Sequence, residues 1–266
     1  MQTRRNWIRS SIGLGGLLLA PELALSKEEI RKFNPRPLNK TIKLSSNENP
    51  YGPSEKVQKA VIKAFDNGCR YPRVYSNALA KKLAKLHRVS PENIIITGGS
   101  TEGLKITGLT FANGGGEIIA AKPTFLAMMD FAEQWGAKIS WTPVGDDKGY
   151  DLNTINNRIN NNTKLVFLCN PNNPTGTVVG KESLIDFCSS ASKKTIIFSD
   201  EAYYDFIQTP NYPSMDSLVR EGENVIVSKT FSKVYGLAGF RIGYLIAPSH
   251  LSKVIRENIG GMTNVL

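Results

Sequence analysis

The sequence predicts an α/β fold in three layers, α/β/α, with a mostly parallel sheet of about seven strands. Two observations lead to this prediction. Short apolar runs alternate with segments of helical periodicity along most of the 266 residues. Several runs, such as Ile94–Ile96 and Leu165–Leu168, are apolar without alternation, which is typical of parallel strands covered by helices on both faces. The pattern is therefore a βαβ series.

Composition and charge exclude several classes of protein. The apolar content of 41% and the charged content of 21% are those of a globular protein. The net charge is +10, but the basic residues are scattered and aromatics do not interleave with them, so we expect no nucleic-acid partner. The three cysteines are widely spaced, and His87 and His250 lie far from them, so we expect no metal site. His87 follows a basic helical pattern and is expected at the surface.

Residues 1–26 have the pattern of an export signal. Arg4 and Arg5 open a basic region, Ile12–Ala20 is a short apolar stretch, and small residues up to Ser26 suit cleavage. The letters R-R-N-W-I-R resemble a twin-arginine signal. We therefore predict export to the periplasm and no membrane attachment after the signal is removed. A cytoplasmic protein is the alternative.

Residues 27–68 are predicted to form an N-terminal arm and one helix, as part of a small domain. Prolines favour an extended arm, which contains N-E-N-P-Y-G-P-S at Asn47–Ser54. Ser54 then caps a helical pattern that reaches Phe65.

Residues 69–248 are predicted to form the large domain, and residues 249–266 to begin a helix that joins it to the small domain. The predicted strands are Asn93–Thr97, Glu117–Ala121, Lys138–Pro143, Lys164–Cys169, Thr195–Asp200, Asn224–Ser228 and Arg241–Ala247. The predicted helices are Asn77–His87, Thr101–Ala112, Leu126–Gln134, Leu152–Ile159, Lys181–Ser192 and His250–Asn258.

Distinctive polar motifs follow the predicted strands, and ligands of open α/β sheets gather at the carboxyl ends of strands. T-G-G-S-T-E-G, at Thr97–Gly103, opens a helix and offers backbone N–H groups to a phosphate; plain turn chemistry is the alternative. In P-T-F, Pro123–Phe125, the ring of Phe125 suits stacking on a flat heteroaromatic ring; a core phenylalanine is an equal alternative.

Two further motifs end buried strands. N-P-N-N-P-T-G, at Asn170–Gly176, is a rigid turn in which the amide of Asn173 can bond a phenolic oxygen. In S-D-E-A-Y, Ser199–Tyr203, a buried Asp200 costs free energy unless paired, and a protonated pyridine nitrogen would be such a partner. Tyr203 can donate to the same phenolic oxygen as Asn173. A helix cap and a packed aromatic are the alternatives for Asp200 and Tyr203.

The segment Ser228–Tyr244 carries the most reactive group. The amine of Lys233 can condense with an aldehyde. The hydroxyls of Thr230 and Ser232 and the guanidinium of Arg241 can hold a phosphate dianion. Together they suit pyridoxal phosphate, which carries an aldehyde and a phosphate. Taken alone, a solvated loop is the alternative.

In this order and spacing the motifs, with R-Y-P at Arg70–Pro72, resemble those of the class I/II aminotransferases, which are fold-type I enzymes. The resemblance is strongest to the histidinol-phosphate aminotransferase branch and spans roughly residues 40 to 260. It implies pyridoxal 5′-phosphate as the cofactor and catalytic roles for Lys233, Asp200 and Tyr203. Lys233 would bond the cofactor's aldehyde as an imine and act as general base.

The resemblance also implies the other contacts of the cofactor. Asp200 would pair with the pyridine nitrogen, Asn173 and Tyr203 would bond the phenolic oxygen, and Phe125 would stack on the ring. The residues implied at the phosphate are Ser100, Thr101, Thr230, Ser232 and Arg241. Tyr71 would reach the cofactor of a neighbouring subunit, which implies a homodimer. The arm Asn47–Tyr51 would lie near the substrate, with Asn49 and Tyr51 as its substrate residues.

The implied reaction moves an amino group between an amino acid, or a phosphorylated amino compound, and a 2-oxo acid. A pyridoxal-phosphate decarboxylase of the threonine-phosphate type and a non-catalytic fragment are the alternatives. The resemblance implies that relatives continue past Leu266 with the rest of the small domain and an arginine that binds the substrate carboxylate. We therefore expect a truncated chain with weak or no transamination.

Overall fold

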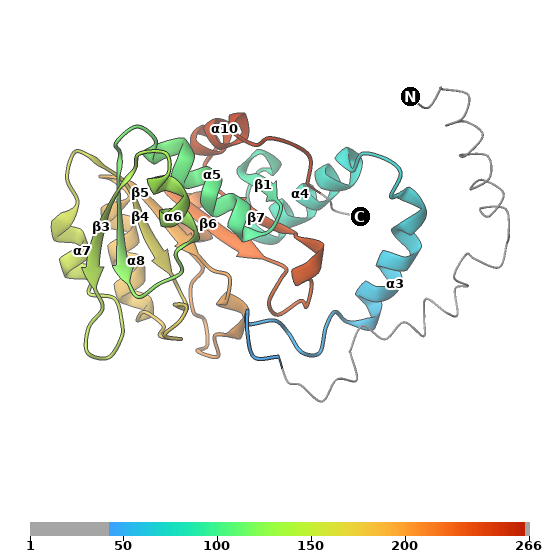
Figure 1. Ribbon diagram of the computed structural model, residues 1–266, viewed down its shortest axis with the longest axis horizontal. Coiled ribbons are helices and arrows are strands. Elements are labelled where there is room, and N and C mark those ends of the chain that lie inside the picture. The colour runs from blue at the N-terminus through green and yellow to red at the C-terminus, as the bar shows by residue number, and fades with distance from the viewer. Residues whose placement is uncertain (1–42, 264–266) are drawn as a thin grey trace, which may run out of the picture. The chain divides into compact units, whose positions relative to one another are not determined.

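The computed structural model describes residues 43–263 (Figure 1). Contacts between residues group the chain from Ser45 onward into one unit, which is the part described below. The predicted export signal and most of the predicted arm lie outside the described residues. In the part of the chain that the structure describes, no helix is both long enough and apolar enough to span a membrane.

A seven-stranded sheet forms the middle layer, in the order β1-β7-β6-β5-β4-β2-β3. Neighbouring strands from β3 to β6 are parallel, and β7 is antiparallel to both β6 and β1. This mostly parallel sheet confirms the predicted fold class. The strands are β1 (Ile94–Thr97), β2 (Glu117–Lys122), β3 (Lys138–Pro143), β4 (Thr163–Cys169), β5 (Ile196–Asp200), β6 (Val225–Thr230) and β7 (Gly243–Ile246).

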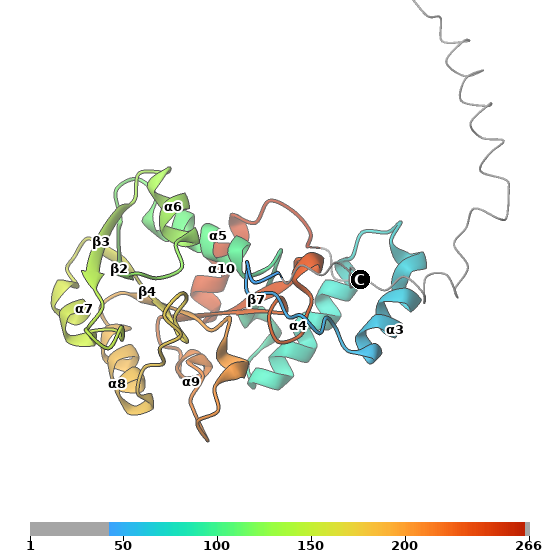
Figure 2. The same cartoon turned by 60° about the horizontal axis from the view of Figure 1, so that its bottom comes forward.

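Helices cover both faces of the sheet (Figure 2). The helices on one face are α5 (Ser100–Ala112), α6 (Ala127–Glu133) and α10 (Ser249–Glu257), which pack on the apolar cluster around Phe167 and Phe198. Those on the other face are α4 (Arg73–His87), α7 (Leu152–Arg158), α8 (Lys181–Ala191) and α9 (Asp216–Arg220), which pack on the cluster around Val166 and Val227. Because strand side chains alternate, Phe198 and Ile197 face opposite clusters.

One helix lies apart from these layers. α3 (Glu55–Ala64) begins where the Ser54 side chain accepts a hydrogen bond from the backbone N–H of Val57, as its N-cap position predicts. None of its residues is buried. The short helix α9 was not predicted, because five residues are too few for a helical period to show in the sequence.

The prediction that His87 lies at the surface is wrong. Its side chain is buried, and both ring nitrogens have partners there: Nδ1 lies 2.6 Å from Asp216 Oδ2, and Nε2 lies 3.0 Å from the hydroxyl of Tyr244. The basic pattern of α4 describes only that helix, whereas both partners come from elsewhere, α9 and β7. Burial alone would raise the pKa of Asp216, but the hydrogen bond from His87 and the charge of Arg220 hold this pKa below its ordinary value.

Candidate active site

A cavity of about 620 Å³ lies where β4, β5 and β6 end and α5 begins. Ten of the residues predicted for the cofactor line it: Ser100, Thr101, Phe125, Asn173, Asp200, Tyr203, Thr230, Ser232, Lys233 and Arg241. Seven further residues line the cavity. Asn47 and Glu48 belong to the arm predicted near the substrate, and those not predicted are Ser46, Cys169, Ala202, Ala238 and Gly239. The predicted cofactor residues, from Ser100 to Arg241, meet because the carboxyl ends of parallel strands lie at the same edge of the sheet.

Lys233 lies in the loop that follows β6. Its Nζ donates a hydrogen bond of 2.9 Å to the carbonyl oxygen of Ser46 and lies 5.5 Å from the centre of the Tyr203 ring. Burial lowers the pKa of Lys233 below its ordinary value of 10.5, and the charge of Arg241 acts in the same direction, against Glu48 and Asp200. A lowered pKa leaves more neutral amine at a given pH, and the neutral amine is the nucleophile.

Asp200 ends β5 and is only 2% exposed. Burial raises its pKa from 3.8 to about 7, although the N–H of Ala202 donates a hydrogen bond of 3.3 Å to Oδ1. A cation beside a buried carboxyl group stabilises its ionised form, which burial alone disfavours. Asp200 therefore suits a site for a protonated ring nitrogen.

The start of α5 has the features of an anion site. Arg241 donates from Nη1 to the carbonyl of Ala238 at 2.9 Å and from Nη2 to that of Gly98 at 3.3 Å. These bonds hold the guanidinium beside Gly99, which caps α5 at φ +83°. The free N–H groups and the positive end of the dipole at a helix N-terminus favour a phosphate group, and an arginine adds charge and donors.

The backbone is packed tightly around this anion site. A Cβ on Gly243 would come within 2.6 Å of Ser100 N and 2.7 Å of Gly99 C, so only glycine fits there. On β6 and the loop after it, Thr230 Oγ1 donates to Ser232 Oγ at 3.0 Å. The two hydroxyls thus lie side by side at the edge of the cavity.

The opposite wall carries Asn173 and Tyr203. Asn47 donates from Nδ2 to the Tyr203 hydroxyl at 2.9 Å, and burial raises the pKa of Tyr203. The turn with Asn173 is tied to the turn with Phe125 through Asn172. Its Nδ2 donates to the carbonyl of Pro123 at 3.1 Å, and its Oδ1 accepts from the Thr124 hydroxyl at 2.8 Å. These hydrogen bonds hold the turn that carries Phe125 next to the turn that carries Asn173.

The family follows from comparison with known proteins. Residues 39–263 match the family described as aminotransferase class I and II. The chain belongs to this family. A histidinol-phosphate aminotransferase of Caldicellulosiruptor saccharolyticus is 40% identical over 214 residues, which are 80% of this chain and 60% of that protein. One of Moorella thermoacetica is 41% identical over 217 residues, 81% of this chain and 55% of that protein.

A solved structure gives the same result. The crystal structure of histidinol-phosphate aminotransferase from Sinorhizobium meliloti in complex with pyridoxal-5′-phosphate matches with a TM-score of 0.76 and 27% identity. The match covers 83% of this chain and 60% of that one. This aminotransferase chain thus spans about three fifths of the length of the relatives it matches.

The residues of the cavity fit pyridoxal phosphate. The donors at the α5 N-terminus suit its phosphate, buried Asp200 suits its ring nitrogen, and Lys233 suits its aldehyde. Asn173 and Tyr203 line the same cavity with groups that can bond a phenolic oxygen. In the described residues, no three His, Cys, Asp or Glu side chains gather in a way that could hold a metal ion.

Three predicted residues of the aminotransferase site lie outside the cavity lining. Asn49 donates from Nδ2 to the carbonyl of Val234 at 2.9 Å, next to Lys233. Tyr51 and Tyr71 are 79% and 87% exposed. Their proposed contacts with substrate and with a second subunit stay predictions.

Proposed function

We propose that this chain is the cofactor-binding part of a pyridoxal-phosphate-dependent aminotransferase. Its reaction moves an amino group between an amino acid, or a phosphorylated amino compound, and a 2-oxo acid. The observation that carries the proposal is that one cavity joins the amine of Lys233, the buried carboxyl of Asp200 and the guanidinium of Arg241. An amine, an acid and an anion site in one cavity correspond to the aldehyde, ring nitrogen and phosphate of the cofactor.

Bound pyridoxal phosphate supplies an aldehyde and an electron-withdrawing ring. Arg241, Ser100 and Thr101 hold the phosphate at the start of α5. Ionised Asp200 keeps the opposite end of the site negative and so keeps the ring nitrogen protonated. Asn173 and Tyr203 would bond the phenolic oxygen of the ring, and Phe125 would stack on the ring. The residues of the cavity would thus hold both the phosphate and the ring of the cofactor.

Lys233 does the proton chemistry. Its lowered pKa favours the neutral amine, which bonds to the aldehyde. With the cofactor bound, Lys233 would take the proton from the substrate's α-carbon as general base and would return a proton to the product as general acid. The arm carbonyl of Ser46, at 2.9 Å, is placed to hold the protonated amine.

Two further parts of the proposal concern assembly and location. A homodimer is proposed because the hydroxyl of Tyr71, on a side chain that is 87% exposed, is free to reach a second subunit. Export to the periplasm is proposed because Arg4 and Arg5 open a signal-like segment.

The cofactor test uses the 266-residue chain. Titration with pyridoxal phosphate should give a visible absorption band, and reduction with borohydride followed by peptide mapping should place the label on Lys233. A label on another lysine, or no band, would overturn the proposal. We expect weak or no transamination from this chain. Any new amino acid formed from an added 2-oxo acid supports transamination, whereas release of carbon dioxide without a 2-oxo acid would support the decarboxylase.

A further inference from the structure

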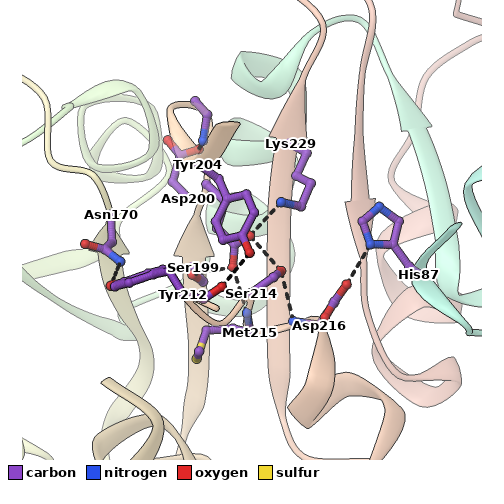
Figure 3. A network of polar contacts seen from close by, with 12 residues as sticks. His87, Asn170, Ser199, Asp200, Tyr204, Tyr212, Ser214, Met215, Asp216 and Lys229 are labelled. Carbon is purple, nitrogen blue, oxygen red and sulfur yellow. Dashed lines mark hydrogen bonds and ion pairs between the residues drawn. The ribbon is translucent and has the colours of Figure 1, made fainter. Parts of the chain in front are cut away.

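A buried ion pair of Lys229 and Glu201 lies where β5 and β6 end, outside the cavity lining. Figure 3 shows Lys229 together with Asp200, Tyr204 and Ser214. Lys229 Nζ is 2.7 Å from Glu201 Oε2, and the two side chains are 10% and 3% exposed. Glu201 belongs to the D-E-A-Y motif and Lys229 to the S-K-T-F-S-K motif, but neither lines the cavity. The proposed reaction has no use for either group.

Every polar atom of this pair is engaged. Glu201 Oε2 also accepts from the Ser214 hydroxyl at 2.7 Å, and Oε1 accepts from the N–H of Met215 at 2.8 Å. Lys229 Nζ lies 3.9 Å from the centre of the Tyr204 ring, a cation–π contact. Because desolvation cancels much of the attraction in a buried ion pair, such a pair adds little net stability but fixes geometry.

Each residue of the ion pair is the direct neighbour in the sequence of a residue that lines the cavity. Asp200 and Glu201 are consecutive and point to opposite faces, as do Lys229 and Thr230. Asp200 and Thr230 line the cavity, so Glu201 and Lys229 join the same two strand ends from behind. The N–H of Glu201 donates to the carbonyl of Ser228 at 2.9 Å, which continues the β5–β6 ladder to this point.

We propose that Glu201 and Lys229 are positioning residues that hold Asp200 in place against the ring nitrogen of the cofactor. This inference rests on the proposed function. Moving the Glu201 backbone moves Asp200 with it, because the two share a peptide bond. A loss of the ion pair therefore changes the contact of Asp200 with the ring nitrogen more than it changes the phosphate contacts at α5.

The charge of Lys229, as well as its position, supports the pairing of Asp200 with the ring nitrogen. After burial, the negative charge of Glu201 is a further cause that raises the pKa of Asp200. Lys229 lies against Glu201 and neutralises it. Without Lys229, an uncompensated carboxylate would lie directly behind Asp200 and favour its protonated form, which pairs less strongly with a cationic nitrogen.

The test compares two probes, pyridoxal phosphate and its analogue in which carbon replaces the ring nitrogen. The wild-type chain should bind pyridoxal phosphate roughly tenfold or more tightly than the analogue, the value of a charge-assisted hydrogen bond. In Lys229→Met this ratio should fall by about threefold or more. Lys229→Arg, which keeps the charge and the donors, should keep the ratio within about twofold.

A purely structural role would weaken both probes equally, so an unchanged ratio in Lys229→Met overturns the inference. If that variant does not fold, Ser214→Ala removes one bond to Glu201 without leaving a buried charge unpaired. It should lower the ratio by about twofold, and no change there overturns the inference as well.

In Asp200→Asn the ratio should be near one and insensitive to Lys229→Met. A wild-type chain that binds neither probe refutes the proposed function, whereas one that binds both with an unchanged ratio in the variants refutes only the positioning role.

Discussion

The amine of Lys233 donates a hydrogen bond of 2.9 Å to the backbone carbonyl of Ser46, 187 positions earlier in the chain. The next residue, Asn47, donates to the hydroxyl of Tyr203. Ser46 and Asn47 both have left-handed backbone angles, with φ of 70° and 50°. The arm therefore forms one wall of the cavity. A ligand that bonds to the Lys233 amine replaces the hydrogen bond from this amine to Ser46.

Replacing Lys233 by alanine should remove the attachment point of the cofactor. We expect Lys233→Ala to lose the visible absorption band and to bind pyridoxal phosphate at least about tenfold more weakly, because only the non-covalent contacts remain. Absorption spectroscopy and equilibrium dialysis measure the two effects. Lys253→Ala, at an exposed lysine of α10, is the control and should behave as wild type. A band that survives in Lys233→Ala would disprove the assignment.

The pKa of Asp200 should make the cofactor-free protein less stable as the pH rises. The unfolded chain releases this proton near its ordinary pKa of 3.8, and the folded chain only near 7. Between these values the folded state binds more protons, so the free energy of unfolding falls with pH, by roughly 4 kcal/mol at most. Above about pH 7 the contribution is constant.

Urea unfolding at about pH 5 and about pH 7.5 tests this dependence. Relative to wild type, Asp200→Asn should become more stable at the higher pH, because its amide does not titrate. Asp66→Asn, at an exposed carboxylate, should leave the pH dependence unchanged. Equal pH dependence in wild type and Asp200→Asn would contradict a raised pKa.

Gly243 should not tolerate a side chain. In Gly243→Ala the new methyl would meet backbone atoms of Gly99 and Ser100, which cannot move without disturbing the start of α5. We expect a loss of about 1–3 kcal/mol in stability and a larger loss of affinity for pyridoxal phosphate than for pyridoxal, which has no phosphate. Gly239→Ala is the matched control, since Gly239 lines the same cavity but has open space around a Cβ. Equal losses for the two probes would argue against a phosphate site there.

The buried His87 should contribute to stability although it lies far from the chemistry. His87→Ala would leave Asp216 buried with only Arg220, at 3.0 Å, as its ionic partner. We expect a loss of about 2–4 kcal/mol in the free energy of unfolding. His250→Ala, at the exposed histidine, should change it by no more than about 0.5 kcal/mol. A small effect at His87 would show that Arg220 alone satisfies the Asp216 carboxylate.

The strands could be predicted because unbroken apolar runs report burial on both faces. The exceptions involve charged residues. β6 was predicted to end at Ser228, but it continues through Lys229 to Thr230, because Glu201 pairs with the buried lysine. β7 was predicted to begin at Arg241, whereas that residue has a left-handed φ of 55° and the strand begins at Gly243.

The site could be predicted where a residue follows a strand of the sheet. Asp200, Asn173 and Thr101 were found because carboxyl ends of parallel strands converge, whatever the loops do. Ser46 was missed because the arm belongs to no strand, and its place depends on a contact with Lys233 far along the chain. Asn47 was predicted only as part of an arm near the substrate, and its hydrogen bond to Tyr203 was not predicted. Cys169 was missed because its side chain looks like any buried strand residue in the sequence.

The pairing of β1 with β7 has a consequence for how the protein is made. The ladder joins Ile94 to Ile246, so β1 leaves the ribosome long before β7, its neighbour in the described sheet, exists. Until then the buried faces of Ile95 on β1 and Leu104 on α5 have no complete core to enter. Closing so distant a contact slows folding and exposes apolar surface to aggregation. Synthesis up to Ile246 is therefore the earliest point at which the sheet can close, and chains interrupted before it are expected to need chaperones to stay soluble.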